Sequence, residues 1–289
     1  MTRRLVLFTL LLVLVAWALA PAARGMLLVR HGPTPFPVDQ IYESQFVQFM
    51  TRDGVQLSGT LAESPAPAGT VILVHGFKST RAEMYDRVGI LYPTYSVLVF
   101  DSRGTGSSGG VFGVGATEDR DIIGAVDFIV GRNGPGADRI AVFGVSLGAG
   151  DAILAGAEDQ RIRAVIADSA WADERVQLEH MYTLPLGPIA IPLLPYEPAL
   201  VDALVGGRLE DARPRDAVAR IAPRALLMIH SADDGNATTP VLDAQAVYAA
   251  AGEPKEFWLA PSGGHAGAFY AHPDDYKTRV LSFLEAGLK

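Results

Sequence analysis

The stretch Ile140-Ala141-Val142-Phe143-Gly144-Val145-Ser146-Leu147-Gly148 decides the fold of this chain. Its apolar start predicts a strand buried on both faces, and the residues after the serine predict a helix over 147–157. Serine is a weak nucleophile, and a tight strand-to-helix turn holds it exposed beside a base. Gly144 and Gly148 suit that turn because a Cβ at either position would collide with neighbouring backbone. The helix N-terminus also favours negative charge developing at Ser146, which we therefore predict to be a nucleophile.

Similar apolar runs elsewhere predict further buried strands, and amphipathic segments between them predict helices. The runs are 71–74, 97–100, 164–166 and 225–229, and the helical segments are 119–130, 241–251 and 276–284. An Arg-Asp-Gly turn joins two earlier strands, 46–51 and 55–62, into a hairpin. This alternation predicts an α/β fold with one doubly wound, mostly parallel sheet and an antiparallel hairpin at its start.

A histidine set among glycines is the candidate general base. His265 lies in Gly263-Gly264-His265-Ala266-Gly267, after a predicted strand over 256–259 and before the last helix. A glycine-rich loop at the carboxyl end of a strand allows an imidazole to reach a serine in the cleft. We predict that His265 takes the proton of Ser146.

The acid that orients this histidine has three candidates. Asp233 and Asp234 both follow the predicted strand 225–229, and Asp168 ends an earlier strand. A buried carboxylate that accepts the imidazole N–H fixes the tautomer and stabilises the imidazolium. Placement at strand ends alone leaves Asp234, Asp233 and Asp168 open.

Acyl transfer also needs donors for the oxyanion of the tetrahedral intermediate. The backbone N–H of Leu147, next to the nucleophile, is one predicted donor. The N–H of Phe77 is the other, because the glycine-containing loop 75–78 ends a buried strand. We expect His75 to bond the loop backbone rather than act as a base, since it precedes the nucleophile in the chain.

The N-terminus has the layout of an export segment. Arg3 and Arg4 precede an unbroken apolar run from Leu5 to Ala20. We predict that residues 1–24 are a cleaved signal peptide or a single transmembrane anchor, that 25–42 are a proline-containing linker, and that 43–289 form the folded domain. Either alternative places the domain outside the cytoplasm, membrane-anchored or secreted.

Composition excludes several classes of function. The formal charge is −8 over 289 residues with no cluster of Lys or Arg, so we expect no nucleic-acid partner. The chain has no cysteine, which excludes disulfides and thiolate chemistry. The six histidines show no metal-ligand spacing, and we expect neither a metal nor an organic cofactor.

Four motifs resemble those of the α/β-hydrolase superfamily over about residues 46–284. These are the oxyanion loop 73–77, the D-x-R-G-x-G-x-S turn 101–108, the nucleophile elbow 144–148 and the G-G-H-x-G loop 263–267. The chain is most similar to the BEM46-like and S9-peptidase-like serine hydrolases that carry a signal or a membrane anchor and a short cap. Their H-G-x-x-D acid loop implies Asp234, although Ser231 replaces its glycine. Asp101 and Arg103 are interpreted as an internal ion pair that braces their turn.

The alternation of predicted strands and helices is interrupted over about residues 171–208, which we interpret as the cap insertion. Five prolines there rule out a sheet strand and a long unkinked helix: Pro185, Pro188, Pro192, Pro195 and Pro198. Apolar residues between them either pack the cap or face an acyl chain or a membrane: Leu184, Leu186, Ile189, Ile191, Leu193 and Leu194.

These observations predict a carboxylesterase- or lipase-like serine hydrolase that forms an acyl-enzyme on Ser146. We expect a small-molecule or lipid-like acyl substrate, an ester or thioester, and membrane association through the N-terminal segment and the cap. An amidase, peptidase or acyltransferase with the same residues is the first alternative. A non-catalytic binding protein on the same fold is the second.

Overall fold

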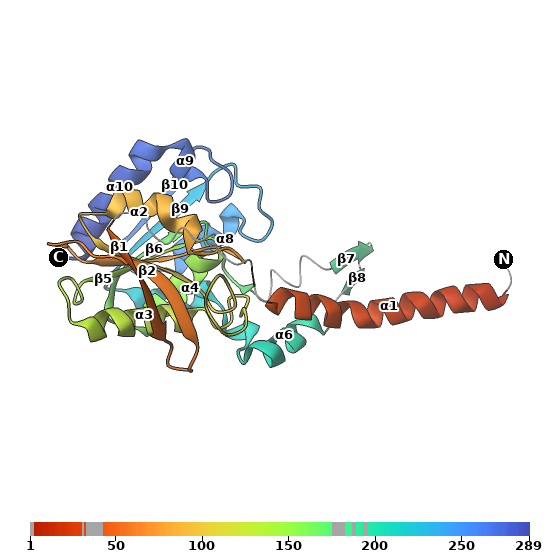
Figure 1. Cartoon of the computed structure of the whole chain (residues 1–289). Coiled ribbons are helices and arrows are strands. Elements are labelled where there is room, and N and C mark those ends of the chain that lie inside the picture. The colour runs from red at the N-terminus through yellow and green to blue at the C-terminus, as the bar shows by residue number, and fades with distance from the viewer. Residues whose placement is uncertain (1–2, 31, 33–42, 175–182, 187–188, 193–195) are drawn as a thin grey trace.

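The computed structural model describes residues 3–30, 32, 43–174, 183–186, 189–192 and 196–289. An eight-stranded sheet runs through the domain in the order β1-β2-β4-β3-β5-β6-β9-β10 (Figure 1). Its strands are β1 (Ser44–Met50), β2 (Gln56–Ala62), β3 (Thr70–Val74), β4 (Ser96–Asp101), β5 (Ile140–Val145), β6 (Ile162–Asp168), β9 (Ala225–Ser231) and β10 (Lys255–Ala260). β2 pairs antiparallel with β1 and β4, and all other pairs are parallel. The predicted doubly wound, mostly parallel sheet with an antiparallel hairpin at its start is confirmed.

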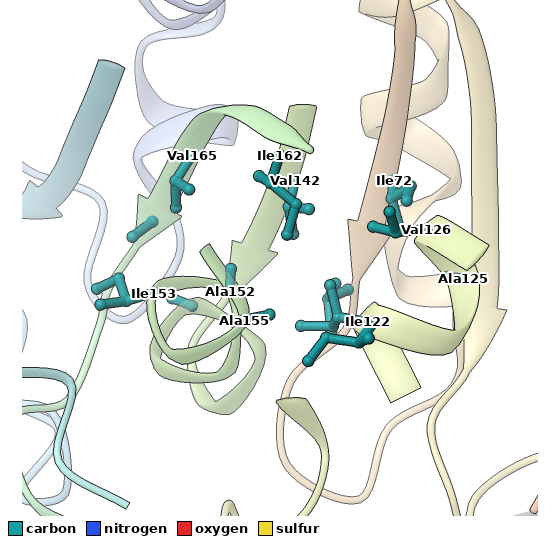
Figure 2. Close-up of a cluster of buried hydrophobic side chains, with 14 of the residues drawn as sticks. Ile72, Ile122, Ala125, Val126, Val142, Ala152, Ile153, Ala155, Ile162 and Val165 are labelled. Carbon is teal, nitrogen blue, oxygen red and sulfur yellow. The ribbon is translucent and has the colours of Figure 1, made fainter. Parts of the chain in front are cut away.

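Helices cover both faces of this sheet, which is why its central strands are apolar on both sides. The helices α3 (Asp119–Arg132), α4 (Leu147–Glu158) and α8 (Val241–Ala250) pack on one face. In Figure 2, Ile122 and Val126 of α3 lie near Ile72, and Ala152 of α4 lies near Val142. The helices α2 (Tyr85–Leu91) and α10 (Pro273–Gly287) pack on the other face. The remaining short elements are α6 (Glu197–Val205), α7 (Pro214–Ala217), α9 (Ala268–Ala271) and the 3₁₀ turns Arg81–Met84, Leu209–Asp211 and Val218–Ile221.

A long N-terminal helix, α1 (Arg3–Val29), projects from the domain (Figure 1). By length and composition it is able to cross a membrane, with a mean hydropathy of 2.6 in its most apolar window. The linker expected from residue 25 begins later, because the helix continues through the apolar residues 26–29. The rest of that predicted linker, 33–42, lies outside the described residues.

The expectation that prolines exclude strands from the insertion was wrong. β7 (Thr183–Leu186) and β8 (Ile189–Pro192) form a separate antiparallel hairpin that contains Pro185 and Pro192. A two-stranded hairpin has two free edges, where a missing N–H costs no ladder bond. The predicted cap positions Pro188, Leu193, Leu194 and Pro195 lie outside the described residues.

The D-x-R-G turn is braced by ion pairs, but its two charged residues do not pair with each other. Asp101 contacts the guanidinium of Arg81 and accepts its backbone N–H at 2.8 Å. Arg103 pairs with Asp121 at 2.7 Å and with Asp53 at 2.8 Å. The predicted internal pair is therefore replaced by three external pairs. They join the turn to the 3₁₀ turn before α2, to α3 and to the β1–β2 turn.

Candidate active site

Ser146 lies between β5 and α4 in a strained backbone conformation, with φ 56° and ψ −117°. The flanking glycines make this turn sterically possible. A Cβ on Gly144 would lie 1.9 Å from the carbonyl oxygen of Gly148, and one on Gly148 would lie 2.6 Å from that of His75. The collision expected from the sequence is thus present at both positions.

His265 reaches Ser146 from the loop between β10 and α9. Its Nε2 lies 2.8 Å from Ser146 Oγ. Gly263 and Gly264 adopt positive φ, which shapes the loop that carries the imidazole. The backbone N–H of Ala266 donates to Ser169 Oγ at 3.1 Å and fixes the far side of the loop.

The structure brings Asp234, and not the other two candidates, against the imidazole. Asp234 Oδ2 lies 2.9 Å from His265 Nδ1, and the carboxylate is fully buried. Asp233 instead accepts the N–H of Gly264 at 2.8 Å, and Asp168 accepts the hydroxyl of Tyr276 at 2.7 Å. A carboxylate only accepts hydrogen bonds, so Nδ1 carries the proton and Nε2 is left to accept from Ser146.

Two neighbours of this dyad were not predicted from the sequence. His230 Nε2 lies 3.2 Å from the same Asp234 oxygen, and Thr239 Oγ1 lies 3.0 Å from His265 Nδ1. Burial lowers the pKa of His230, so a neutral imidazole borders the acid. The four-residue spacing between His230 and Asp234 was the available sequence signal, since β9 ends at Ser231 and the chain then turns back beside His230.

The two residues predicted to supply oxyanion donors, Phe77 and Leu147, both line the cavity that contains Ser146. Within the described part of the chain, neither residue's N–H donates to another backbone carbonyl. Gly76, between His75 and Phe77, donates its N–H to Glu83 Oε2 at 2.8 Å, which holds the loop in place.

His75 braces this loop, as expected. Its Nε2 lies 3.1 Å from the N–H of Ser102, which only donates, so Nδ1 carries the proton and donates to Gly76 O at 2.8 Å. Burial lowers the pKa of His75 and keeps the ring neutral. Nε2 also lies 3.2 Å from Thr105 Oγ1, so the partners of both ring nitrogens belong to the loops around it and not to the nucleophile.

The cavity at Ser146 has a volume of about 540 Å³. One wall is apolar and is formed by Leu28, Val114, Leu147 and Trp171. Asn236, Thr238 and Thr239 of the acid loop form a polar side, and Arg24, Glu83 and Glu174 add ionisable groups. The arrangement brings Ser146, His265, Phe77, Leu147 and an apolar surface together in one cavity.

Glu174 makes stability depend on pH. Burial raises its pKa to about 8, and Glu118 and Asp173 add repulsion. The folded state therefore binds a proton that the unfolded state releases above its ordinary pKa of 4.5. The stabilisation is fully present below pH 4.5 and is lost as the pH rises towards 8.

We predict that Glu174→Gln removes much of this dependence. Between pH 5 and pH 8 the melting temperature of the unmodified chain should fall by about 5 °C or more, and that of the variant by clearly less. Thermal unfolding of the full chain in detergent, followed by circular dichroism, measures how the melting temperature of each protein changes with pH. Equal slopes would contradict a raised pKa at Glu174.

A family model for X-Pro dipeptidyl-peptidases of the S15 family matches residues 75–258, more than half of the chain. The chain belongs to the S15 peptidase family. The S15 match includes Ser146 and Asp234, and His265 lies just beyond its end.

Individual relatives agree with this placement. Protein YfhR of Escherichia coli K12 is 28% identical over 267 residues, which cover 88% of this chain and 86% of YfhR. The thiohydrolase aneE of Aspergillus aculeatus is 31% identical over 131 residues, which cover 42% of this chain and 40% of aneE. The esterase Pf2001 of Pyrococcus furiosus superposes with a TM-score of 0.70 at 25% identity and covers 90% of this chain and 99% of its own. The predicted α/β-hydrolase superfamily is confirmed, and this S15 member is a serine hydrolase.

Proposed function

We propose that this chain hydrolyses carboxylic esters or thioesters through an acyl-enzyme on Ser146. The observation that carries the proposal is the continuous contact from Ser146 Oγ through His265 to the buried carboxylate of Asp234, at 2.8 and 2.9 Å. A binding protein would have no use for this contact. The proposed roles are nucleophile for Ser146, general base for His265 and orienting acid for Asp234.

The reaction follows from these contacts. Ser146 Oγ attacks the substrate carbonyl carbon while its proton passes to His265 Nε2, and Asp234 stabilises the imidazolium. The N–H groups of Phe77 and Leu147 bind the oxyanion. The imidazolium then protonates the leaving alcohol or thiol as the C–O or C–S bond breaks. Water, deprotonated by His265, attacks the acyl-enzyme and releases the carboxylic acid and free Ser146.

Two features favour an ester or thioester over a peptide. The relatives named as an esterase and a thiohydrolase act on such bonds, and the cavity has an apolar wall suited to an acyl chain. Peptide hydrolysis is the second candidate, because the S15 family is named for X-Pro dipeptidyl-peptidases. A peptide's α-amine needs a negative charge that is free to bind it. Of the two glutamates that line the cavity, Glu83 already accepts the N–H of Gly76, and Glu174 is largely protonated at pH 7, with a pKa of about 8.

The proposed location is a membrane surface outside the cytoplasm. The apolar part of α1 is almost entirely exposed. Exposed apolar surface of this extent favours insertion in a bilayer. Arg3 and Arg4 precede it and favour an N-terminus inside the cell.

A substrate panel on the full chain in detergent micelles separates the two candidates. We expect kcat/KM for p-nitrophenyl esters and acyl thioesters to exceed that for Ala-Pro p-nitroanilide by about 100-fold or more, since the apolar wall of the cavity suits an acyl chain. The Ser146→Ala variant measures background hydrolysis. Faster cleavage of the anilide would replace esterase with peptidase as the function.

A further inference from the structure

The end of α1 is built into the catalytic domain. Leu28 and Val29 are 8% and 7% exposed, whereas Leu27 beside them is 59% exposed. Leu28 and Val29 belong to a buried apolar cluster with Val114, Leu147 and Trp171. Leu147 directly follows the nucleophile, so the end of α1 packs in the same apolar cluster as the residue next to Ser146.

Specific contacts fix the helix at this position. A Cβ on Gly25 would lie 3.1 Å from the side chain of Leu200, so α1 and α6 pack closely there. Arg24 pairs at 3.1 Å with Glu197, a carboxylate only 2% exposed. Lys78, from the loop that carries Phe77, donates to the carbonyl oxygen of Leu27 at 2.6 Å. These contacts hold α1 between the cap helix α6 and the oxyanion loop.

The helix end also forms part of the cavity surface. Leu28 and Arg24 line the cavity that contains Ser146 and His265. Leu28 lies on its apolar wall with Val114 and Trp171. A substrate chain lying on this wall would therefore contact α1.

The same helix leads from the cavity into the exposed apolar segment. Its unbroken apolar run, Leu5 to Ala20, is about 24 Å long as a helix, about 6 Å shorter than the hydrocarbon core of a typical bilayer. Leu28 follows the run by about 12 Å, which places the cavity next to the outer edge of the lipid headgroups when the run is in the membrane.

We propose that the end of α1 is a substrate-binding wall, and that the substrate is a long-chain acyl ester taken from the membrane in which α1 is anchored. This inference rests on the proposed function and narrows its substrate class. The ester carbonyl reaches Ser146, while the acyl chain lies along Leu28, Val114 and Trp171 towards the bilayer.

The test uses the full chain reconstituted in phosphatidylcholine vesicles, with p-nitrophenyl palmitate in the bilayer and p-nitrophenyl butyrate in water. We expect Leu28→Ala to lower kcat/KM for palmitate by about tenfold and for butyrate by less than about twofold. Leu28→Trp narrows the cavity at this wall and should also shift the substrate preference from palmitate to butyrate. Leu27→Ala, at the adjacent exposed position, is the matched control and should leave both values unchanged.

The proposed binding wall would be overturned if both Leu28 variants lost kcat/KM by the same factor on the two esters. It would also be overturned if they behaved like Leu27→Ala. The source of substrate is tested by placing palmitate in the enzyme's own vesicles or in separate vesicles. Turnover about tenfold faster in the shared membrane is expected, and equal rates would overturn supply from the anchoring membrane. If the unmodified chain hydrolyses neither ester, the proposed esterase function itself fails. If it hydrolyses both esters and the Leu28 variants do so equally well, only the binding wall fails.

Discussion

Replacing Asp234 with asparagine should lower kcat by about 10³- to 10⁴-fold while the chain stays folded. Asp234 is fully buried and lies 2.9 Å from His265 Nδ1. An asparagine can present its NH₂ group to Nδ1, which would hold the imidazole in the tautomer with a proton on Nε2. That tautomer is unable to accept the proton of Ser146. Steady-state hydrolysis of p-nitrophenyl butyrate measures the loss.

Asp233→Asn is the matched control, because the two aspartates are adjacent. Asp233 contacts the backbone N–H of Gly264 and no ring nitrogen of His265. We expect it to retain activity within about threefold of the unmodified chain, since surface changes of this kind are small. Similar losses in the two variants, or a larger loss in Asp233→Asn, would contradict the assignment of the acid.

The second large effect is on stability. Gly144→Ala should destabilise the domain by about 4 kcal/mol or more, because its Cβ would lie 1.9 Å from the carbonyl oxygen of Gly148. Neither group is free to move, since both belong to the turn that holds Ser146 in its strained conformation. Chemical denaturation of the full chain in detergent gives the change in the free energy of unfolding.

Gly131→Ala provides the control for this substitution. Gly131 lies in α3, and nothing stands within 4 Å of its added Cβ. Alanine in an exposed helical position stabilises by up to about 1 kcal/mol relative to glycine. A Gly144→Ala variant as stable as Gly131→Ala would show that the turn is looser than the structure indicates.

Much of the fold followed from local sequence pattern. The apolar runs of β3, β4 and β5 are buried over their full length. A continuous apolar run predicts a strand that is covered on both faces, as these strands are. The turn at Ser146 could be predicted because only small residues fit its steric limits. His265 was identifiable from its place after the last strand.

Other features depend on contacts between distant residues, which a sequence does not display. Asp233 and Asp234 are chemically equal neighbours, and only the path of the loop decides which one meets His265. Arg103 was expected to pair with Asp101, but Asp121 and Asp53 lie nearer once α3 and the β1–β2 turn are packed.

The end of α1 was missed for a related reason. The sequence pattern predicts an apolar N-terminal segment that ends at Arg24, although residues 26–29 are again apolar. That second apolar group, with Gly25 before it, was the signal for a helix that continues into a packed contact. Its partners on α6 and beside Ser146 are more than 100 residues away in the chain.

Labelling of the full chain with a fluorophosphonate, followed by mass spectrometry of the adduct, tests whether Ser146 is the nucleophile. We expect one adduct, on Ser146, which is absent in Ser146→Ala and forms about 10³-fold more slowly in His265→Ala because the base is gone. A folded chain that is not labelled, or one labelled on another residue such as Ser169, would contradict it.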